Sequence, residues 1–117
     1  MNLRLFRGRN AESRARRTLE QAGLRTLTTN YRCRVGEIDI IMLDGETLVF
    51  IEVRFRADDD FGGALASVDQ RKQRKLIRAA LHYLGCHPEH ANRGTRFDVM
   101  AMNGASCDWV RDAFRPL

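Results

Sequence analysis

The sequence predicts an α/β domain in which one mixed sheet is flanked by helices. Two segments, 9–22 and 67–85, carry apolar residues at helical spacing, and a strong β-hairpin pattern over 37–55 lies between them. A further strand pattern covers 96–102. Elements in the order α, β, β, β, α, β are typical of a single sheet with helices packed against it. At 117 residues, we expect one domain over 1–117.

The first helix is expected over residues 9–22, where Ala22-Gly23 forms a stop signal. One face of this helix carries Glu12, Ala15, Leu19 and Ala22. A carboxylate therefore lies on the apolar side of the helix, near its start. A weakly patterned strand over 25–32 follows.

The hairpin is the clearest unit in the chain. Its strands, 37–43 and 47–55, alternate in polarity and flank Asp44-Gly45, a dipeptide that favours a tight turn. A two-residue turn places Glu37 opposite Glu52, whereas a four-residue loop places Asp39 opposite Glu52. Either register leaves these three carboxylates on one face together with Arg54.

Carboxylates on one face of a buried hairpin require a compensating cation. Burying a polar group without a partner costs about 2–7 kcal/mol, and neighbouring carboxylates also repel one another. A divalent metal such as Mg²⁺, which is held by one or two carboxylates plus waters and phosphate oxygens, is one solution. The other is a buried ion pair in which Arg54 neutralises Asp39 and Glu52. Spacing alone leaves both open.

The second half of the chain supplies a loop, a helix and a strand. Residues 57–66 are rich in Gly and Asp and are expected to form a loop. Ser67 to Gln70 reads as a capping box that starts the second helix, which Gly85 ends. The expected buried stripe of that helix is Leu76, Ile77, Ala80, Leu81 and Leu84. The segment 107–114 is ambiguous.

Charge and composition narrow the class of partner. The net charge is +5 and the sequence pI about 9.7, and nucleic acid is the commonest partner of a basic domain. All but two of the 20 basic residues, Lys72 and Lys75, are arginine, so the charge can also reflect genome composition. No apolar run approaches the ~18 residues of a membrane span, and because the first ten residues lack an apolar segment, we do not expect them to be a signal peptide.

Cysteine usage indicates the compartment. The three cysteines, Cys33, Cys86 and Cys107, are odd in number and include no CxxC pair, which suits a reducing cytoplasm. We therefore expect a cytoplasmic protein without a membrane partner.

Several of these residues together resemble a known family. The run Gly36-Glu37-Ile38-Asp39, the strand Phe50 to Arg54, Lys72, and Arg96-Phe97-Asp98 resemble the YraN-like family of bacterial proteins. By similarity, that family belongs to the PD-(D/E)xK restriction-endonuclease-like superfamily, which includes archaeal Holliday-junction resolvases. The resemblance covers nearly the whole chain and implies a restriction-endonuclease-like αβββαβ core.

The resemblance implies a site residue by residue. Asp39 and Glu52 match the two acids that ligate Mg²⁺ or Mn²⁺, and Glu12 matches the acid on the first helix that supports them. Arg54 stands where the motif has lysine. Because arginine stays protonated in proteins, it cannot act as a general base, although it can stabilise charge on a phosphate.

Three functions remain open on these grounds. The resemblance implies a nucleic-acid-binding, Mg²⁺-dependent endonuclease, with DNA favoured over RNA and branched DNA as one substrate class. A resolvase-like activity would require a homodimer, since it needs two active sites. The alternative is a catalytically degenerate nucleic-acid-binding module in which Arg54 replaces the lysine of the metal site. A third is an interaction protein whose basic charge is incidental.

The remaining candidates have weaker patterns. The expected phosphate contacts are Arg14, Arg17, Arg56 and Lys72. Lys72 can instead extend its stem over the apolar stripe and keep its ammonium in water. We expect Asp98 to form a structural salt bridge, to Arg96 or to Arg56. Cys86, His87 and His90 lack a fourth ligand and do not predict a zinc site.

Overall fold

The computed structural model describes residues 3–56 and 61–116, with the backbone alone described for 3–9 and 61–62. The elements in chain order are α1 Leu3–Gln21, β1 Arg25–Cys33, β2 Gly36–Asp44, β3 Thr47–Phe55, α2 Phe61–Ala66, α3 Gln70–Cys86, the 3₁₀ turn η1 Pro88–His90, β4 Thr95–Met102 and β5 Cys107–Phe114. Five strands form one sheet in the order β1-β2-β3-β4-β5. Only β3 and β4 run parallel, and the other neighbours are antiparallel. The predicted α/β class with one mixed sheet flanked by helices is confirmed.

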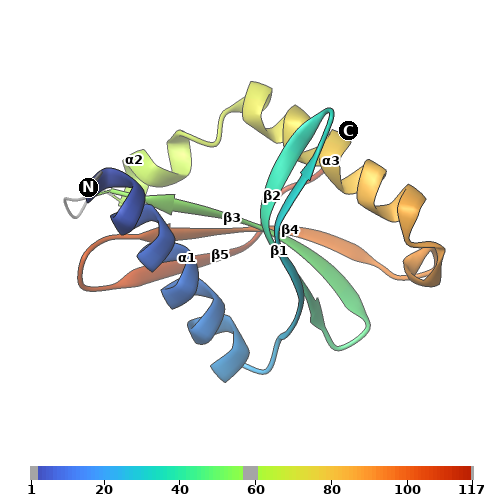
Figure 1. The fold of residues 1–117 in the computed structure, drawn as a ribbon, viewed down its shortest axis with the longest axis horizontal. Coiled ribbons are helices and arrows are strands. Elements are labelled where there is room, and N and C mark those ends of the chain that lie inside the picture. The colour runs from blue at the N-terminus through green and yellow to red at the C-terminus, as the bar shows by residue number, and fades with distance from the viewer. Residues whose placement is uncertain (1–2, 57–60, 117) are drawn as a thin grey trace.

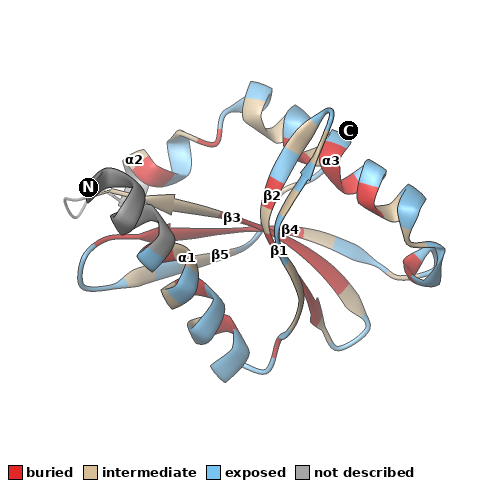
Figure 2. Cartoon of the chain, viewed as in Figure 1, coloured by how far each residue is buried: buried red, intermediate tan, exposed pale blue. Residues whose placement is uncertain are grey.

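Each face of the sheet is covered by a different helix (Figure 1). Ala11, Ala15 and Leu19 of α1 pack with Ile40 and Ile51 on one face. The opposite face packs against α3, and its core contains Ile41, Leu43, Leu48, Phe50, Leu76, Ala79, Ala80 and Tyr83. Buried residues of the central strands therefore point to both faces of the sheet, and the central strands are largely buried in Figure 2. Because β3 is covered on both faces, a charged side chain on β3 is removed from water.

The hairpin follows one of the two predicted registers. Asp44 pairs with Thr47 and Ile40 with Ile51, so the turn is Gly45-Glu46 and not the predicted Asp44-Gly45. Gly45 has φ 59°, a left-handed conformation that glycine adopts without strain. The turn therefore centres one residue later than predicted, and Asp39 lies at the level of Glu52.

Several predicted element boundaries need correction. Residues 61–66 form the helix α2 and not a loop, while 57–60 lie outside the described residues. The N-cap of α3 is Asp69, whose carboxylate accepts from the backbone N–H of Lys72 at 2.9 Å. Ser67, predicted as the cap, instead donates its hydroxyl to the carbonyl of Ala64. The helix therefore begins two residues later than the capping-box pattern indicates.

The buried stripe of α3 also differs from the prediction. Ala79 and Tyr83 are buried, whereas Leu81 is 63% exposed. Tyr83 stacks on His87 and packs edge-on against Tyr31, which turns its side of the helix toward the sheet. The ambiguous segment 107–114 is the edge strand β5. None of the helices in the described ranges has the length and apolar character needed to cross a membrane.

Candidate functional site

The candidate site lies where β2 separates from β3. Their paired residues end at Ile40 and Ile51, whereas β2 stays paired with β1 as far as Gly36 and Cys33. The β1–β2 hairpin therefore bends away from the rest of the sheet toward α3 (Figure 1). Asp39 is the first β2 residue beyond that separation.

Asp39 is held by the backbone of the strand it has left. The N–H of Val53 donates to Oδ2 of Asp39 at 2.8 Å, two residues past the last β2–β3 pair. The carboxylate thus replaces a main-chain acceptor at the point where the ladder ends. This hydrogen bond fixes Asp39 beside Glu52.

Glu52 is the buried carboxylate of the site. It is 6% exposed, because the central strand β3 is covered on both faces. Burial, and then the neighbouring charge of Asp39, raises the pKa of Glu52 to about 8. Asp39 thus lies close enough to Glu52 to disfavour its ionisation. The fold thus holds together two groups that repel each other when both are ionised.

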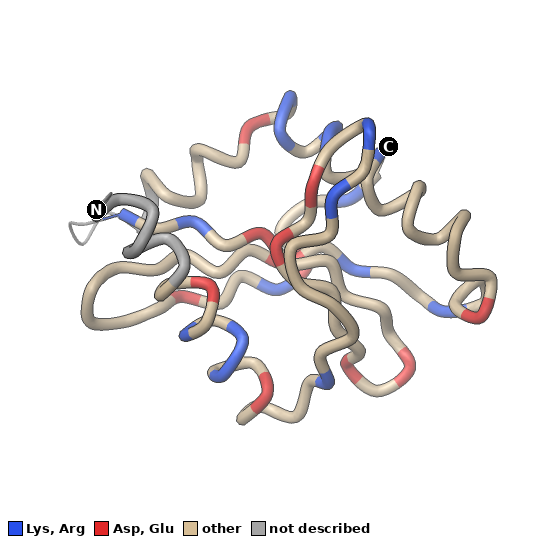
Figure 3. Tube along the Cα trace, in the orientation of Figure 1, with Lys and Arg blue, Asp and Glu red and all other residues tan. Residues whose placement is uncertain are grey.

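Glu12 brings a third carboxyl to Asp39 from α1. Its neighbour Ala11 and the following Ala15 are buried against the sheet, which directs this part of the helix toward β2. Burial, and then the neighbouring charge of Asp39, raises the pKa of Glu12 to about 7. Carboxyls from α1, β2 and β3 therefore meet around Asp39, and acidic segments of β2 and β3 lie near the centre of Figure 3.

Two cations approach Glu52 without bonding to it closely. Nε of Arg54 lies 3.6 Å from Oε1 of Glu52, and Nζ of Lys72 lies 3.9 Å from Oε2. Both separations exceed hydrogen-bond length. Nε of Arg54 is buried and has no hydrogen-bond partner among the described residues. The site thus contains positive charge that is near the carboxylates but is not saturated by them.

Comparison with known proteins places most of the chain, including the candidate site, in one protein family. A profile of the uncharacterised protein family UPF0102 matches residues 11–102. The chain belongs to the UPF0102 family. It is 54% identical over 112 residues to a UPF0102 protein of Alcanivorax borkumensis, an alignment that covers 92% of this chain and 90% of that protein. A UPF0102 protein of Halorhodospira halophila is 55% identical over 109 residues, covering 93% and 87%.

The UPF0102 match spans all five converging residues, Glu12, Asp39, Glu52, Arg54 and Lys72. It stops at the end of β4, so the edge strand β5 lies outside it. Within this UPF0102 chain, the site is therefore built entirely from the part that defines the family.

The other predicted phosphate contacts do not join the site. Nη1 of Arg14 donates to the carbonyl oxygen of Asn103 at 2.8 Å, which ties α1 to the end of β4. Nη1 of Arg56 donates to the carbonyl of Phe55, and Arg17 is exposed. Of the four predicted cations, only Lys72 reaches a carboxylate of the site.

Glu37 does not belong to the cluster formed by Glu12, Asp39 and Glu52. It is exposed and pairs with Arg32 at 3.5 Å, although its charge contributes to the raised pKa of Glu12. Glu37 lies beyond the last residues that pair β2 with β3, Ile40 and Ile51, so it is not opposite Glu52 in the ladder.

Asp98 forms the predicted structural salt bridge, and its partner is Arg96. Nε and Nη2 of Arg96 bind the two carboxylate oxygens at 2.9 and 3.0 Å. The indole N–H of Trp109 and the backbone N–H of Asp112 also donate to it. Asp98 is thus a satisfied anchor for β5.

Histidine and cysteine do not assemble into a metal site. Nδ1 of His87 bonds to the carbonyl of Tyr83, and Nδ1 of His90 accepts from Arg93. In the part of the chain that the structure describes, no three His, Cys, Asp or Glu side chains form a group that could hold a metal ion, and this includes Glu12, Asp39 and Glu52. Any metal at the Asp39 site would therefore need water or substrate oxygens as additional ligands.

Proposed function

We propose that this UPF0102 protein binds nucleic acid and is a Mg²⁺-dependent endonuclease of the PD-(D/E)xK type. One observation carries the proposal: Asp39 and Glu52 are held side by side, and the nearby cations stand beyond hydrogen-bond distance from Glu52. The structural ion pair between Arg96 and Asp98 in the same chain is much shorter, with 2.9 Å between Nε and Oδ1. The contrast supports a site shaped for an additional cation.

The donor set fits Mg²⁺. Asp39 and Glu52 present hard carboxylate oxygens, and Mg²⁺ in proteins is typically bound by one or two carboxylates together with waters and substrate phosphates. The raised pKa values of Glu12 and Glu52 arise from burial and from Asp39. A divalent cation would offset both effects. Two inner carboxylates without a third rigid ligand leave coordination positions for a phosphate.

The residues of the site can be given roles. Asp39 and Glu52 would hold the metal, and the carboxyl of Glu12, which lies near Asp39, would support them from α1. When bound, the metal polarises the scissile phosphate and lowers the pKa of a water. Arg54, whose Nε has no hydrogen-bond partner within residues 3–56 and 61–116, would donate to a phosphate oxygen as charge develops. Lys72 would neutralise Glu52 from the α3 side.

The second candidate is the degenerate binding module. In it, Arg54 is the permanent counter-charge of Glu52, and the 3.6 Å separation of Nε and Oε1 is within ion-pair range. The module would bind nucleic acid and leave it intact. We favour the nuclease because a permanent, buried ion pair between Arg54 and Glu52 would be expected to form a direct hydrogen bond.

A cleavage assay with a matched inactive variant tests the proposal. Supercoiled, branched and single-stranded DNA, with RNA beside them, are incubated with the protein in Mg²⁺ or Mn²⁺ and in EDTA. We expect metal-dependent cleavage of DNA in preference to RNA, lost in Glu52→Gln. Cleavage equal in Glu52→Gln and in the parent, or absent with both metals, would overturn the nuclease. A resolvase-like pair of cuts would further require a homodimer.

We also propose that the protein is cytoplasmic. Its three cysteines are free, as is usual in a reducing compartment.

A further inference from the structure

We propose that a basic pocket between the tip of the β1–β2 hairpin and the start of α3 binds the backbone phosphates of a nucleic-acid strand and guides that strand to Asp39 and Glu52. The inference deepens the proposed function and rests on it for the nature of the ligand. The pocket has a volume of about 500 Å³. Its lining residues are Arg32, Cys33, Arg34, Val35, Gly36, Glu37, Lys72 and Lys75.

The hairpin is seated directly on the helix. A Cβ added to Gly36 would lie 3.1 Å from the carbonyl oxygen of Lys75 and 3.7 Å from Cβ of Ala79. Only glycine allows the backbone of β2 to approach α3 this closely without displacing one of them. The close approach sets the distance between the hairpin cations and the helix cations, so the pocket is a fixed feature of the packing.

The pocket is strongly positive, and most of its cationic side chains are exposed and could contact a phosphate. Four of its side chains are cationic and only Glu37 is acidic. Arg34 and Lys75 are exposed, and among the described residues neither has an ion-pair partner. Arg32 pairs with Glu37, but that pair is exposed at 3.5 Å and such pairs are weak. Blue segments at the hairpin tip and at the start of α3 lie near each other in Figure 3.

Lys72 connects the pocket to the carboxylates. It lines the pocket, and its Nζ lies 3.9 Å from Oε2 of Glu52. A strand whose phosphates lie along Arg34 and Lys75 would therefore meet the metal-binding face next. Val35, 42% exposed at the hairpin tip, offers an apolar surface for a sugar or base.

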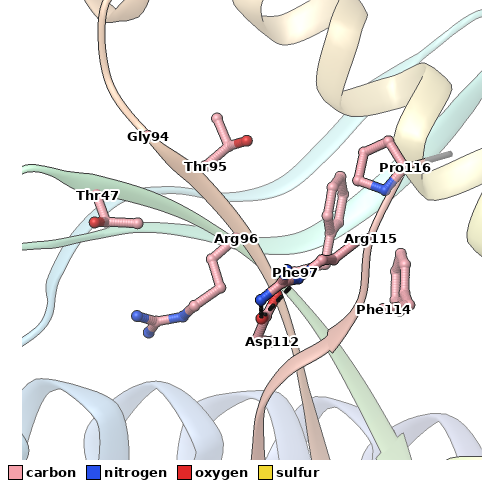
Figure 4. A pocket seen from close by; sticks show the side chains of 9 residues that line it. All are labelled: Thr47, Gly94, Thr95, Arg96, Phe97, Asp112, Phe114, Arg115 and Pro116. Carbon is pink, nitrogen blue, oxygen red and sulfur yellow. Dashed lines mark hydrogen bonds and ion pairs between the residues drawn. The ribbon is translucent and has the colours of Figure 1, made fainter.

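A second pocket in the same chain contains arginines that are already paired with carboxylates (Figure 4). It has a volume of about 490 Å³ and is lined by Arg96 and Arg115 among others. Arg115 is bound to Asp112, and Arg96 to Asp98 and Asp44. Its cations already have carboxylate partners, so it lacks the free charge that distinguishes the hairpin pocket.

Salt-dependent binding in EDTA tests the inference independently of catalysis. The probe is a short, labelled, random-sequence DNA duplex, and the variant is the double change Arg34→Ala with Lys75→Ala. Each phosphate contact contributes about −0.9 to the slope of log K against log salt on duplex DNA. We expect the variant to lose about 1.8 from the magnitude of that slope and to bind at least about tenfold more weakly at low salt.

The matched control removes the same charge elsewhere. Arg16→Ala with Arg25→Ala changes two exposed residues outside the pocket, on α1 and at the far end of β1, and should leave the slope unchanged. The pair Arg34→Gln with Lys75→Gln repeats the test if the alanine variant melts early. Equal losses in pocket and control variants, or no loss in either, would overturn the pocket.

Failure of the pocket and failure of the nuclease give different results. If the protein is only a binding module, the pocket variant still loses affinity in EDTA while no protein cleaves DNA in Mg²⁺. If the nuclease is right and the pocket wrong, the parent cleaves, and the pocket variant binds and cleaves like the control. Asp39→Asn should bind the duplex in EDTA at least as well as the parent, because it removes only negative charge.

Discussion

The backbone N–H of Val53 donates to Oδ2 of Asp39 at 2.8 Å, so the carboxylate of one strand completes the ladder of the next. The same hydrogen bond holds Asp39 against the buried carboxyl of Glu52. Two mutually repulsive groups are therefore kept adjacent by main-chain geometry.

Asp39→Asn should show whether Asp39 and Glu52 mainly repel each other or are stabilised by a buried ion pair. Asparagine retains an oxygen that can accept from Val53 and removes the charge that raises the pKa of Glu52. If the carboxylates are under-compensated, the free energy of unfolding in EDTA should stay unchanged or rise, while stabilisation by added Mg²⁺ disappears. Chemical denaturation with and without Mg²⁺ measures both. A loss of about 3–5 kcal/mol that Mg²⁺ does not alter is the signature of a broken buried ion pair and would favour the inert module.

Stability without metal should fall as the pH rises. Glu52 and Glu12 have folded-state pKa values of about 8 and about 7, both above the ordinary value. Between about pH 4.5 and these values the unfolded chain releases protons that the folded protein keeps, so alkaline conditions favour unfolding. Thermal melting in EDTA across this window should show a falling melting temperature. The slope should be shallower in Glu52→Gln, and a flat parent profile would count against the cluster.

Arg54→Lys should preserve the fold and retain or increase cleavage. Nε of Arg54 has no hydrogen-bond partner in the described part of the chain, so the change to lysine removes little direct bonding. Lysine restores the residue that the motif has at this position. Paired melting and cleavage assays, with Glu52→Gln as the inactive control, test the change. Early melting without activity in Mg²⁺ or Mn²⁺ would mean that Arg54 is the structural partner of Glu52, and the binding module would replace the nuclease.

Two glycine-to-alanine changes should act in opposite directions. In Gly36→Ala the new Cβ would meet the carbonyl oxygen of Lys75 at 3.1 Å, and overpacking of this kind costs about 1–3 kcal/mol. Gly85 lies in α3 with nothing within 4 Å of an added Cβ, so Gly85→Ala should stabilise by up to about 1 kcal/mol. Equilibrium unfolding measures both. If Gly36→Ala is neutral, the hairpin is not seated on α3 as described.

The sequence predicts much of the site because the acids follow strand alternation. Asp39, Glu52 and Glu12 are identifiable from spacing and from the family resemblance, and the structure places Glu12 and Glu52 near Asp39. The register was open because alternation is the same in both alternatives; the conformation of Gly45 decides it. The separation of Glu37 from the cluster depends on the bend of the hairpin, which no local pattern encodes.

The basic pocket was harder to predict because its cations come from distant segments. Arg32 and Arg34 alternate around the β1–β2 turn, and Lys72 and Lys75 are one helical turn apart. These spacings are local signals of two basic faces. Only the close approach of Gly36 to α3 brings the faces together. The exposure of Leu81 likewise depends on how Tyr83 packs against β1.

The most direct test of the central claim is a crystal of the protein soaked in Mn²⁺ and measured for anomalous scattering. The account predicts a peak between Asp39 and Glu52, within about 2.0–2.3 Å of a carboxylate oxygen of each, that is absent from crystals of Asp39→Asn. The contradicting result is no peak at this position, with Arg54 or Lys72 hydrogen-bonded directly to Glu52.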